Sequence, residues 1–364
     1  MLPLSVLHVI WSAGMGGIGK IVYHLLKEQQ EDATMKVGLL IAKEEGELMY
    51  DFGQLKIKMD IAGFKSGLQV NREVINRCKT AISEYDIIHF HTFNPVLAWA
   101  ANKSNKKIVY TEHGNFGFGR TATINDKVVR KMQQYFLNNF TDAITYNSKF
   151  SEDVSKNFYG IRARVSKVIY NGVPDYTASE NANSVFPKAP GTFLIVAIGR
   201  LAPVKRFDRL IEAFHKLQLP EARLIILGEG PEEKSLKEQV NRLKLENRIS
   251  FPGYGDSRAL LSVCDICVAP SQGEAFGLVA IEAYQQGKKV IAFEDGGGLT
   301  EIIRPIDSHA IVASVEELTS LLYAIYADRK METSAEIIEH RKKYAKEYSI
   351  EKMAATLKEL YISL

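Results

Sequence analysis

The sequence predicts an α/β protein built from two doubly wound, Rossmann-like domains. Short apolar runs rich in Ile and Val alternate with longer stretches of helical period. The runs are apolar without alternation, as expected of parallel strands that helices cover on both faces. They form two series, one in each half of the 364 residues, and this length exceeds what one ordinary α/β core needs.

The predicted strands follow one another in the same pattern in both halves. The first series is SVLHVI (5–10), VGLLIA (37–42), DIIHF (86–90), KIVY (107–110) and AITY (143–146). The second series is FLIVAI (193–198), RLIILG (223–228), ISF (249–251), ICVA (266–269) and KVIAF (289–293). Helical patterns follow at 314–328 and 334–362.

A linker is predicted over residues 174–192, which contain three prolines, small polar residues and no apolar period. The two domains then span 1–173 and 193–340. The helical residues 341–364 could pack on either domain.

The composition excludes several classes of protein. The formal net charge of +3 is too small for a dedicated nucleic-acid-binding protein. No apolar run reaches the roughly 18–20 residues that span a bilayer. The apolar start, Met1–Trp11, lacks the basic residues of a signal peptide and fits a first buried strand better. Three cysteines are too few for a disulfide framework, so we expect a cytoplasmic protein.

Glycines, histidines and charged residues gather where the predicted strands end. In an open parallel sheet the carboxyl ends of the strands line the ligand crevice, and two such crevices facing each other would form one cleft. In the first half these residues are Gly14–Gly19, His89, His91 and Glu112–Gly114; in the second they are Gly199, Arg200, Gly228–Gly230, Ser271–Glu274 and Gly296–Gly298.

The segment 270–303 is the most informative part of the chain. A helix is predicted from Phe276 or Gly277 to Gln286, so the backbone N–H groups of Gly277, Leu278 and Val279 would form an anion site. Glu274 precedes this helix, and Glu282 lies about 8–9 Å along the helix from its start. Carboxylates accept hydrogen bonds from sugar hydroxyls, although two glutamates at this spacing are also typical of a solvated helix face. Glu282 stands among apolar residues, which favours a binding role because a buried charge without a function is costly.

These motifs together resemble the large family of retaining glycosyltransferases with the GT-B fold, glycosyltransferase family 4-like, group 1. The E-x(7)-E pattern of Glu274 and Glu282 marks that family. The resemblance covers nearly the whole chain through GMGGIGKIVYHL, DIIHFH, TEHG, NSKFSED, VIYNGV, GRLAPVKRFDRLIEAF, LIILGEGP, ENRISFPGY, GKKVIAF and GGGLTEII. It implies an acceptor-binding first domain, a nucleotide-sugar-binding second domain and a final helix, 341–364, that crosses back to the first domain.

The resemblance also implies roles for particular residues. Arg200 and Lys205 would neutralise the donor diphosphate, with Gly199 beside them, and Glu274 would hold the hydroxyls of the donor sugar. Gly277, Leu278 and Val279 would form the phosphate cradle, and Glu282 would accept hydrogen bonds from the ribose diol. His113 would reach the donor sugar near the reacting carbon. Gly16 and Gly17 would let the backbone approach the substrates.

The implied reaction moves a sugar from a nucleotide-sugar to a hydroxyl of a glycan or lipid-linked acceptor, with retention at the anomeric carbon. A UDP-sugar is favoured over a GDP-sugar. We expect no metal and no other cofactor, since no Asp-x-Asp motif follows a strand. Bacterial surface polysaccharide or glycolipid synthesis is the expected setting. The oligomeric state is left open.

Other interpretations stay open at this point. Gly14-x-Gly16-x-x-Gly19, with Glu44 further on, matches the fingerprint of an NAD-dependent oxidoreductase. A nucleotide-sugar epimerase or an inactive nucleotide-sugar-binding protein could share the fold. Cys264 and Cys267 are expected to be structural, and His89, His91 and His113 to line the crevice rather than to bind a metal. Basic residues of the first domain could favour contact with the anionic inner face of the membrane, or be solvated: Lys103, Lys106, Lys107, Lys127, Arg130 and Lys131.

Overall fold

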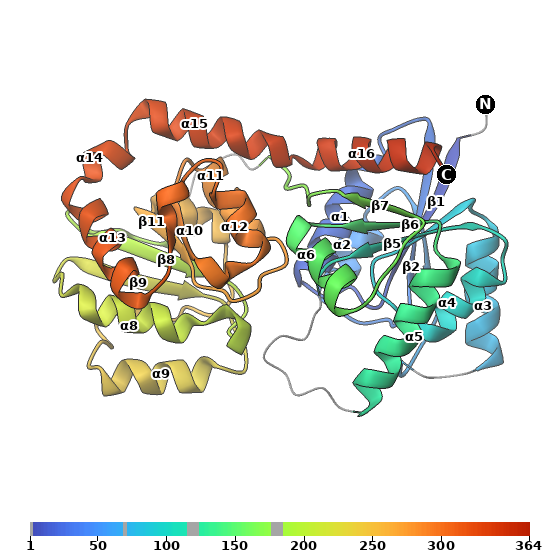
Figure 1. Cartoon of the computed structure of the whole chain (residues 1–364), viewed down its shortest axis with the longest axis horizontal. Helices are drawn as coiled ribbons and strands as arrows, with labels where there is room; N and C mark the ends of the chain where they lie inside the picture. The colour runs from blue at the N-terminus through green and yellow to red at the C-terminus, as the bar shows by residue number, and fades with distance from the viewer. Residues whose placement is uncertain (1–2, 68–70, 115–123, 176–184) are drawn as a thin grey trace. The chain divides into compact units, whose positions relative to one another are not determined.

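The computed structural model describes residues 3–67, 71–114, 124–175 and 185–364 (Figure 1). Residues 176–184 of the predicted linker therefore lie outside the described part. The chain forms two compact units. The first contains Met1–Pro174 together with Ser349–Leu364, and the second contains Asp175–Tyr348.

The first unit is built on a seven-stranded parallel sheet with the strand order β3-β2-β1-β4-β5-β6-β7. Its strands are β1 (Leu4–Ile10), β2 (Met35–Ile41), β3 (Lys58–Ile61), β4 (Ile87–Phe90), β5 (Lys107–Glu112), β6 (Ala143–Tyr146) and β7 (Val165–Val168). Its helices are α1 (Gly17–Gln29), α2 (Met49–Gly53), α3 (Arg72–Ser83), α4 (Pro95–Asn102), α5 (Ile124–Phe140), α6 (Lys149–Asp153) with a π-helical turn (Val154–Phe158), and α16 (Ile350–Ile362).

The second unit has a six-stranded parallel sheet with the order β10-β9-β8-β11-β12-β13. Its strands are β8 (Phe193–Ile198), β9 (Ala222–Leu227), β10 (Ile249–Ser250), β11 (Ile266–Ala269), β12 (Val290–Phe293) and β13 (Ile311–Val312). Its helices are α8 (Phe207–Leu217), α9 (Glu233–Arg242), α10 (Ser257–Val263), α11 (Leu278–Gln285), α12 (Gly298–Ile303), α13 (Val315–Ala327), α14 (Arg329–Glu332) and α15 (Ala335–Ala345), with short 3₁₀ turns at Pro203–Lys205, Glu294–Gly296, Ser308–Ala310 and Lys346–Tyr348.

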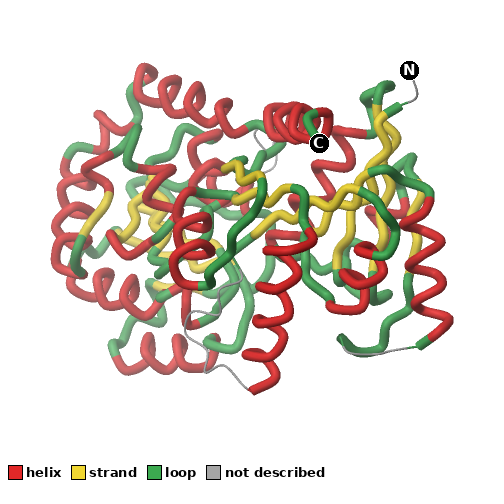
Figure 2. The backbone as a smooth tube through the Cα atoms, turned by 45° about the vertical axis from the view of Figure 1, so that its right-hand side comes forward, coloured by secondary structure: helices red, strands yellow, loops and turns green. Residues whose placement is uncertain are grey.

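Both sheets confirm the predicted doubly wound α/β fold. Strands β4, β6, β11 and β12 are buried along their whole length, which accounts for their uninterrupted apolar sequences. Figure 2 shows, within each unit, the strands lying between layers of helices. This arrangement brings the carboxyl ends of all strands of a sheet to one edge, because every pair is parallel.

The three strands without a sequence signal lie at sheet edges. β3 (KMDI), β7 (VSKV) and the two-residue β13 each pair on one side only. Because an edge strand is partly solvated, it needs fewer apolar residues, and its pattern is weaker.

The helical pattern predicted over 334–362 is divided between α15 and α16. The 3₁₀ turn Lys346–Tyr348 separates the two helices, and the Ser349 side chain accepts a hydrogen bond from Lys352 N as the N-cap of α16. In the first unit α16 packs beside α1, and the Lys358 ammonium contacts Asp32 at 2.5 Å and Thr34 Oγ1 at 2.6 Å. No described helix combines the length and apolar character that crossing a bilayer requires.

Candidate functional site

Each sheet reverses its strand order once, between β1 and β4 in the first unit and between β8 and β11 in the second. Ligands of open α/β sheets bind beyond the carboxyl ends of the strands at this reversal. The predicted residues follow these strands: Gly16 and Gly17 come after β1, Arg200 and Lys205 after β8, and Glu274 after β11. Each sheet therefore has a candidate ligand-binding edge at the carboxyl ends of its strands.

In the second unit the structure brings Lys205 and Glu274 into direct contact. The Lys205 ammonium donates to Glu274 Oε2, and both side chains are about four-fifths shielded from solvent, with 22% and 23% exposed. The two loops are also joined through their backbones, since Gln272 N donates to Val204 O at 2.8 Å.

The surroundings of Glu274 keep its carboxyl ionised. Burial acts to raise the pKa of Glu274, but the nearby Lys205 charge and hydrogen bonds with Lys205 and Ser271 outweigh it, so the pKa lies below its usual value. Glu274 is thus an acceptor for hydroxyl groups across the neutral pH range.

The loop that carries Glu274 is fixed by three backbone hydrogen bonds to the segment after β12. Gly273 N donates to Asp295 O at 2.8 Å, Glu274 N to Gly296 O at 3.1 Å, and Gly298 N to Glu274 O at 2.7 Å. A short parallel bridge joins Glu274 and Gly297. These bonds hold in place the backbone from which the Glu274 side chain extends.

Arg209, in α8, bonds to both of these segments, and no role was predicted for it from the sequence. Its guanidinium donates to Pro270 O (2.9 Å), to Ser271 O (3.1 Å) and, through two nitrogens, to the Asp295 carboxylate (3.0 and 2.7 Å). It also lies 3.6 Å from the centre of the Phe293 ring. Only 8% of the residue is exposed, so Arg209 supports the site without facing solvent.

The start of α11 provides backbone donors beside Glu274. Gly277 caps the helix with φ +96°, a conformation that favours glycine, and a Cβ there would lie 2.5 Å from Leu299 Cδ1. Gly277 is thus required by backbone conformation and packing. Leu278, Val279 and Glu282 follow in α11 and are each half-buried, and Glu282 is engaged by neighbours rather than free.

Arg200 is exposed, and among the residues that the structure describes its side chain has no hydrogen-bond or ion-pair partner. Gly199 precedes it with φ +150°, and a Cβ there would touch the Lys205 side chain at 3.5 Å. Of the two predicted diphosphate partners, Lys205 is therefore held in place and Arg200 extends into solvent.

In the first unit the glycine loop leads from β1 into α1. A Cβ added at Gly14 or Gly16 would meet no atom within 4 Å, whereas one at Gly19 would lie 2.0 Å from Gly14 O. Gly17 is the first residue of α1, and Met15 N donates to Glu47 Oε2 at 2.9 Å. Gly19 is thus needed for close helix packing, while Gly14 and Gly16 leave open space that a ligand could enter.

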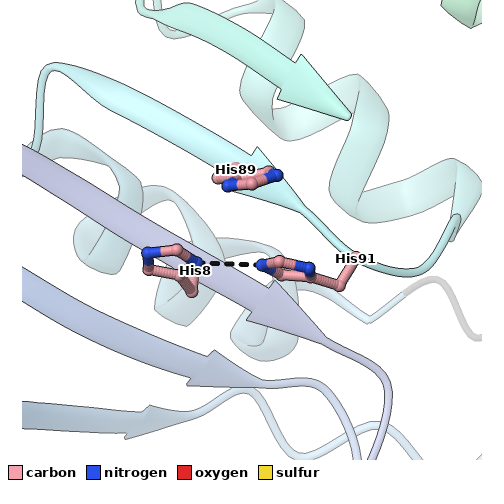
Figure 3. A group of neighbouring side chains, drawn as sticks. All are labelled: His8, His89 and His91. Atoms are coloured by element: carbon pink, nitrogen blue, oxygen red, sulfur yellow. Dashed lines mark hydrogen bonds between the residues drawn. The ribbon is translucent and has the colours of Figure 1, made fainter. Parts of the chain in front are cut away.

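His113 follows β5 and belongs to a hydrogen-bonded row of histidines. Its Nε2 lies 3.0 Å from His91 Nδ1, and His91 Nε2 lies 2.9 Å from His8 Nδ1. His8 is in β1 and His91 directly follows β4. Figure 3 shows the rings of His8, His89 and His91 grouped together, with His8 on β1 and His89 on β4. Asn147 Nδ2 holds the backbone of His113 by donating to its carbonyl at 3.3 Å.

Burial keeps these rings neutral. It lowers the pKa of His8 and of His113 to about 4, and it lowers the pKa of His89 and His91 well below the usual value, with further lowering from neighbouring histidines. His113 can therefore give or accept a hydrogen bond at neutral pH but carries no charge.

Three of these histidines, His8, His89 and His91, lie close enough for their ring nitrogens to surround a metal ion. Each ring already uses both nitrogens in hydrogen bonds. His8 bonds to His91 and to Gln29, both at 2.9 Å. His89 bonds to Tyr361 and to Thr111, both at 2.6 Å. A cation there would have to displace these bonds in a fully buried site without a carboxylate ligand, so the arrangement fits a neutral network better.

The weaker sequence signals have structural explanations. Cys264 and Cys267 are buried, and burial raises the pKa of both thiols. Of the basic residues in the first unit, Lys106 and Lys107 pair with Asp86 and Asp142. Arg130 donates to Tyr159 Oη at 2.6 Å. The two carboxylates offset the charges of Lys106 and Lys107, whereas the neutral Tyr159 hydroxyl leaves the charge of Arg130 unchanged.

The family comparisons match both halves of the chain. Residues 179–348 match the model described as "Glycosyl transferases group 1", and residues 15–175 match the one described as "Glycosyltransferase Family 4".

Among curated proteins, an uncharacterized glycosyltransferase of Methanocaldococcus jannaschii is 29% identical over 239 residues, or 61% of this chain and 61% of that protein. The N-acetyl-alpha-D-glucosaminyl L-malate synthase of Bacillus anthracis is 28% identical over 240 residues, or 61% and 60%. The matched regions thus span only about three-fifths of these relatives.

Among solved structures, Anabaena Alr3699/HepE in complex with UDP and glucose has a similar fold, with a TM-score of 0.84 at 23% identity. That alignment covers 99% of this chain and 100% of the other.

Proposed function

This chain belongs to the group 1 glycosyltransferases with a family 4 N-terminal half, and we propose that it transfers a sugar from a nucleotide-sugar to a hydroxyl acceptor. The observation that carries the proposal is the contact of Lys205 with Glu274 at the carboxyl ends of β8 and β11. A cation for a diphosphate and an ionised acceptor for sugar hydroxyls stand together at the edge where such sheets bind ligands.

In the proposed complex the second unit holds the donor. Lys205 and Arg200 neutralise the diphosphate and stabilise the charge that develops as it leaves, together with the backbone N–H groups of Gly277, Leu278 and Val279. Glu274 accepts hydrogen bonds from the sugar, and Glu282 from the ribose diol. The Lys205–Glu274 contact opens as each partner takes up its own part of the donor.

The first unit supplies His113 to the donor sugar, while Gly16 and Gly17 let the backbone approach the substrates. The acceptor hydroxyl attacks the face that the diphosphate leaves and passes its proton to the departing phosphate, which gives retention. No resident metal is needed in this scheme, because Lys205, Arg200 and a helix N-terminus neutralise the leaving group.

A UDP-sugar is the favoured donor over a GDP-sugar, and the Anabaena protein of similar fold, solved with UDP and glucose, supports this choice. The acceptor is a glycan or a lipid-linked saccharide. The setting that we propose is bacterial surface polysaccharide or glycolipid synthesis in the cytoplasm or at the inner face of the membrane.

The test is thermal unfolding with UDP, GDP or NAD⁺ in excess, with and without EDTA. A ligand at 100 times its dissociation constant adds about 2.7 kcal/mol to the free energy of unfolding. We expect stabilisation by UDP, and none by NAD⁺, with or without EDTA. Stabilisation by NAD⁺ alone would contradict the proposal and favour an oxidoreductase. Conversion of a UDP-sugar to its epimer without an acceptor would favour an epimerase.

A further inference from the structure

The row of histidines that ends at His113 begins at a buried amide. His8 Nε2 lies 2.9 Å from Gln29 Oε1, near the end of α1, so the row runs Gln29, His8, His91, His113. Gln29, His8 and His91 are 2%, 0% and 1% exposed. Water therefore has almost no access to them, and the ring nitrogens of His8 and His91 find their hydrogen-bond partners within the row.

The direction of the row follows from counting hydrogens. A neutral imidazole has one N–H donor and one acceptor nitrogen, and an amide oxygen only accepts. His8 must therefore donate from Nε2 to Gln29, which leaves its Nδ1 to accept from His91 Nε2–H. His91 Nδ1 then accepts from His113 Nε2–H. The position of the hydrogen on each ring is thus set by the ring before it. His113 keeps a lone pair on Nδ1 that can accept a hydrogen bond.

The Gln29 amide joins the row through its oxygen, since Oε1 is the atom 2.9 Å from His8 Nε2, while its Nε2 is buried and has no hydrogen-bond partner among the described residues. Tyr361 Oη is 2.6 Å from His89 Nδ1, and His89 Nε2 is 2.6 Å from Thr111 Oγ1. His89 thus belongs to a separate branch that does not reach His113.

We propose that Gln29, His8 and His91 are positioning residues that hold His113 as the Nε2–H tautomer, with Nδ1 free to accept a hydrogen bond from a substrate hydroxyl. The inference rests on the proposed function, since it specifies how His113 meets the donor sugar. In the described part of the chain no group bonds to His113 Nδ1. The ring therefore meets an O–H donor in its correct form without reorganisation.

The tautomer can be measured directly on the wild-type protein. Selective ¹⁵N labelling of the imidazoles shows which nitrogen of each ring carries hydrogen, and the chain has eight histidines. The signal that disappears in H113Q identifies His113. We expect hydrogen on Nε2 of His113 at neutral pH. Hydrogen on Nδ1 would overturn the proposal. Because this measurement needs no turnover, it decides the tautomer even if the proposed transfer is not observed.

The functional test compares Gln29→Leu with His89→Gln. Gln29→Leu removes the acceptor that sets the direction of the row, so we expect kcat to fall about 10- to 100-fold, the range found for partners that orient a metal-binding histidine. His89→Gln alters an equally buried ring two residues from His91 and outside the row, and it should keep both kcat and the His113 tautomer.

A double-mutant cycle separates positioning from a merely structural effect. In the H113A background, Gln29→Leu should cause little further loss of kcat, because its effect acts through His113. Equal losses of kcat from Gln29→Leu in both backgrounds, or an unchanged tautomer and kcat in Gln29→Leu alone, would overturn the proposal.

Discussion

The ammonium of Lys205 contacts the carboxylate of Glu274 although 69 positions separate them in the chain. One residue lies in the turn after β8 and the other in the loop after β11, and the two strands are neighbours in the sheet. The contact assembles a candidate donor site from two motifs, GRLAPVK and the E-x(7)-E block, that are each weak alone.

Replacement of Lys205 by Gln should weaken binding of the nucleoside diphosphate by about 10- to 100-fold, since hydrogen bonds to charged groups contribute roughly 1.5–3 kcal/mol. Titration calorimetry with UDP measures the effect. Lys188→Gln is a matched control, because Lys188 pairs with Asp265 in the same unit at 2.6 Å with similar exposure. That pair lies at the opposite ends of the same strands. Equal UDP affinity in the two variants would argue against a phosphate role for Lys205.

Replacement of Arg209 by Lys should destabilise the second unit. A lysine cannot reach two carbonyls and both oxygens of Asp295, and each buried acceptor left unpaired costs about 1–3 kcal/mol. Urea unfolding should show the loss, with a raised KM for the donor because the Glu274 loop loses its support. Arg258→Lys, at an exposed pair with Asp256, is the control and should change stability little. A stable R209K protein with a normal KM for the donor would show that Arg209 does not support the Glu274 loop.

Two glycines should respond differently to alanine. Gly277→Ala places a side chain at φ +96° against Leu299, so a loss of about 1–2 kcal/mol in the free energy of unfolding is expected, along with weaker UDP binding. Gly16 has φ −70° and open space around it, so Gly16→Ala should fold normally and lose turnover only. Melting temperatures and initial rates of both variants test this contrast. Normal turnover in Gly16→Ala would show that no ligand uses that space.

The buried histidines predict acid sensitivity of the fold. The pKa of His8 and of His113 is lowered from 6.5 to about 4, so below pH 6.5 the unfolded chain binds protons that the folded chain does not. The free energy of unfolding should therefore fall as the pH drops toward 4, by up to about 1.4 kcal/mol per pH unit for each such ring.

Urea unfolding at about pH 7.5 and about pH 5.5 measures this slope while most carboxylates stay ionised. An H8Q variant should have a shallower slope, whereas a variant of the exposed His340 should match the wild type. A slope that is the same in all three proteins would place the proton uptake elsewhere.

The fold could be predicted from the sequence because its interior strands are buried on both faces. FLIVAI and ICVA are apolar along their whole length, as expected of central strands, and both are central in the second sheet. The edge strand KMDI has one solvated side and carries no comparable signal. The position of α16 beside α1 depends on contacts across more than 300 residues, such as Lys358 with Asp32, which no local pattern records.

The candidate site was only partly visible in the sequence. The types and spacing of Glu274 and Glu282 suggested a sugar site, and the family resemblance added Lys205. Arg209 was hidden because its neighbours FDRLIEAF form an ordinary amphipathic helix. His8 was hidden in a strand, and its link to Gln29 and His91 depends on side-chain directions that spacing alone does not give.

The most direct measurement is the release of UDP or GDP from nucleotide-sugars by the wild type, E274Q and D265N. UDP-glucose, UDP-N-acetylglucosamine and GDP-mannose are each supplied with a panel of sugar and glycolipid acceptors. The account predicts release from a UDP-sugar by the wild type, a loss of about 100-fold or more in E274Q, and near-normal release in D265N, whose carboxylate pairs with Lys188 away from the site. Release by E274Q at the wild-type rate would contradict it.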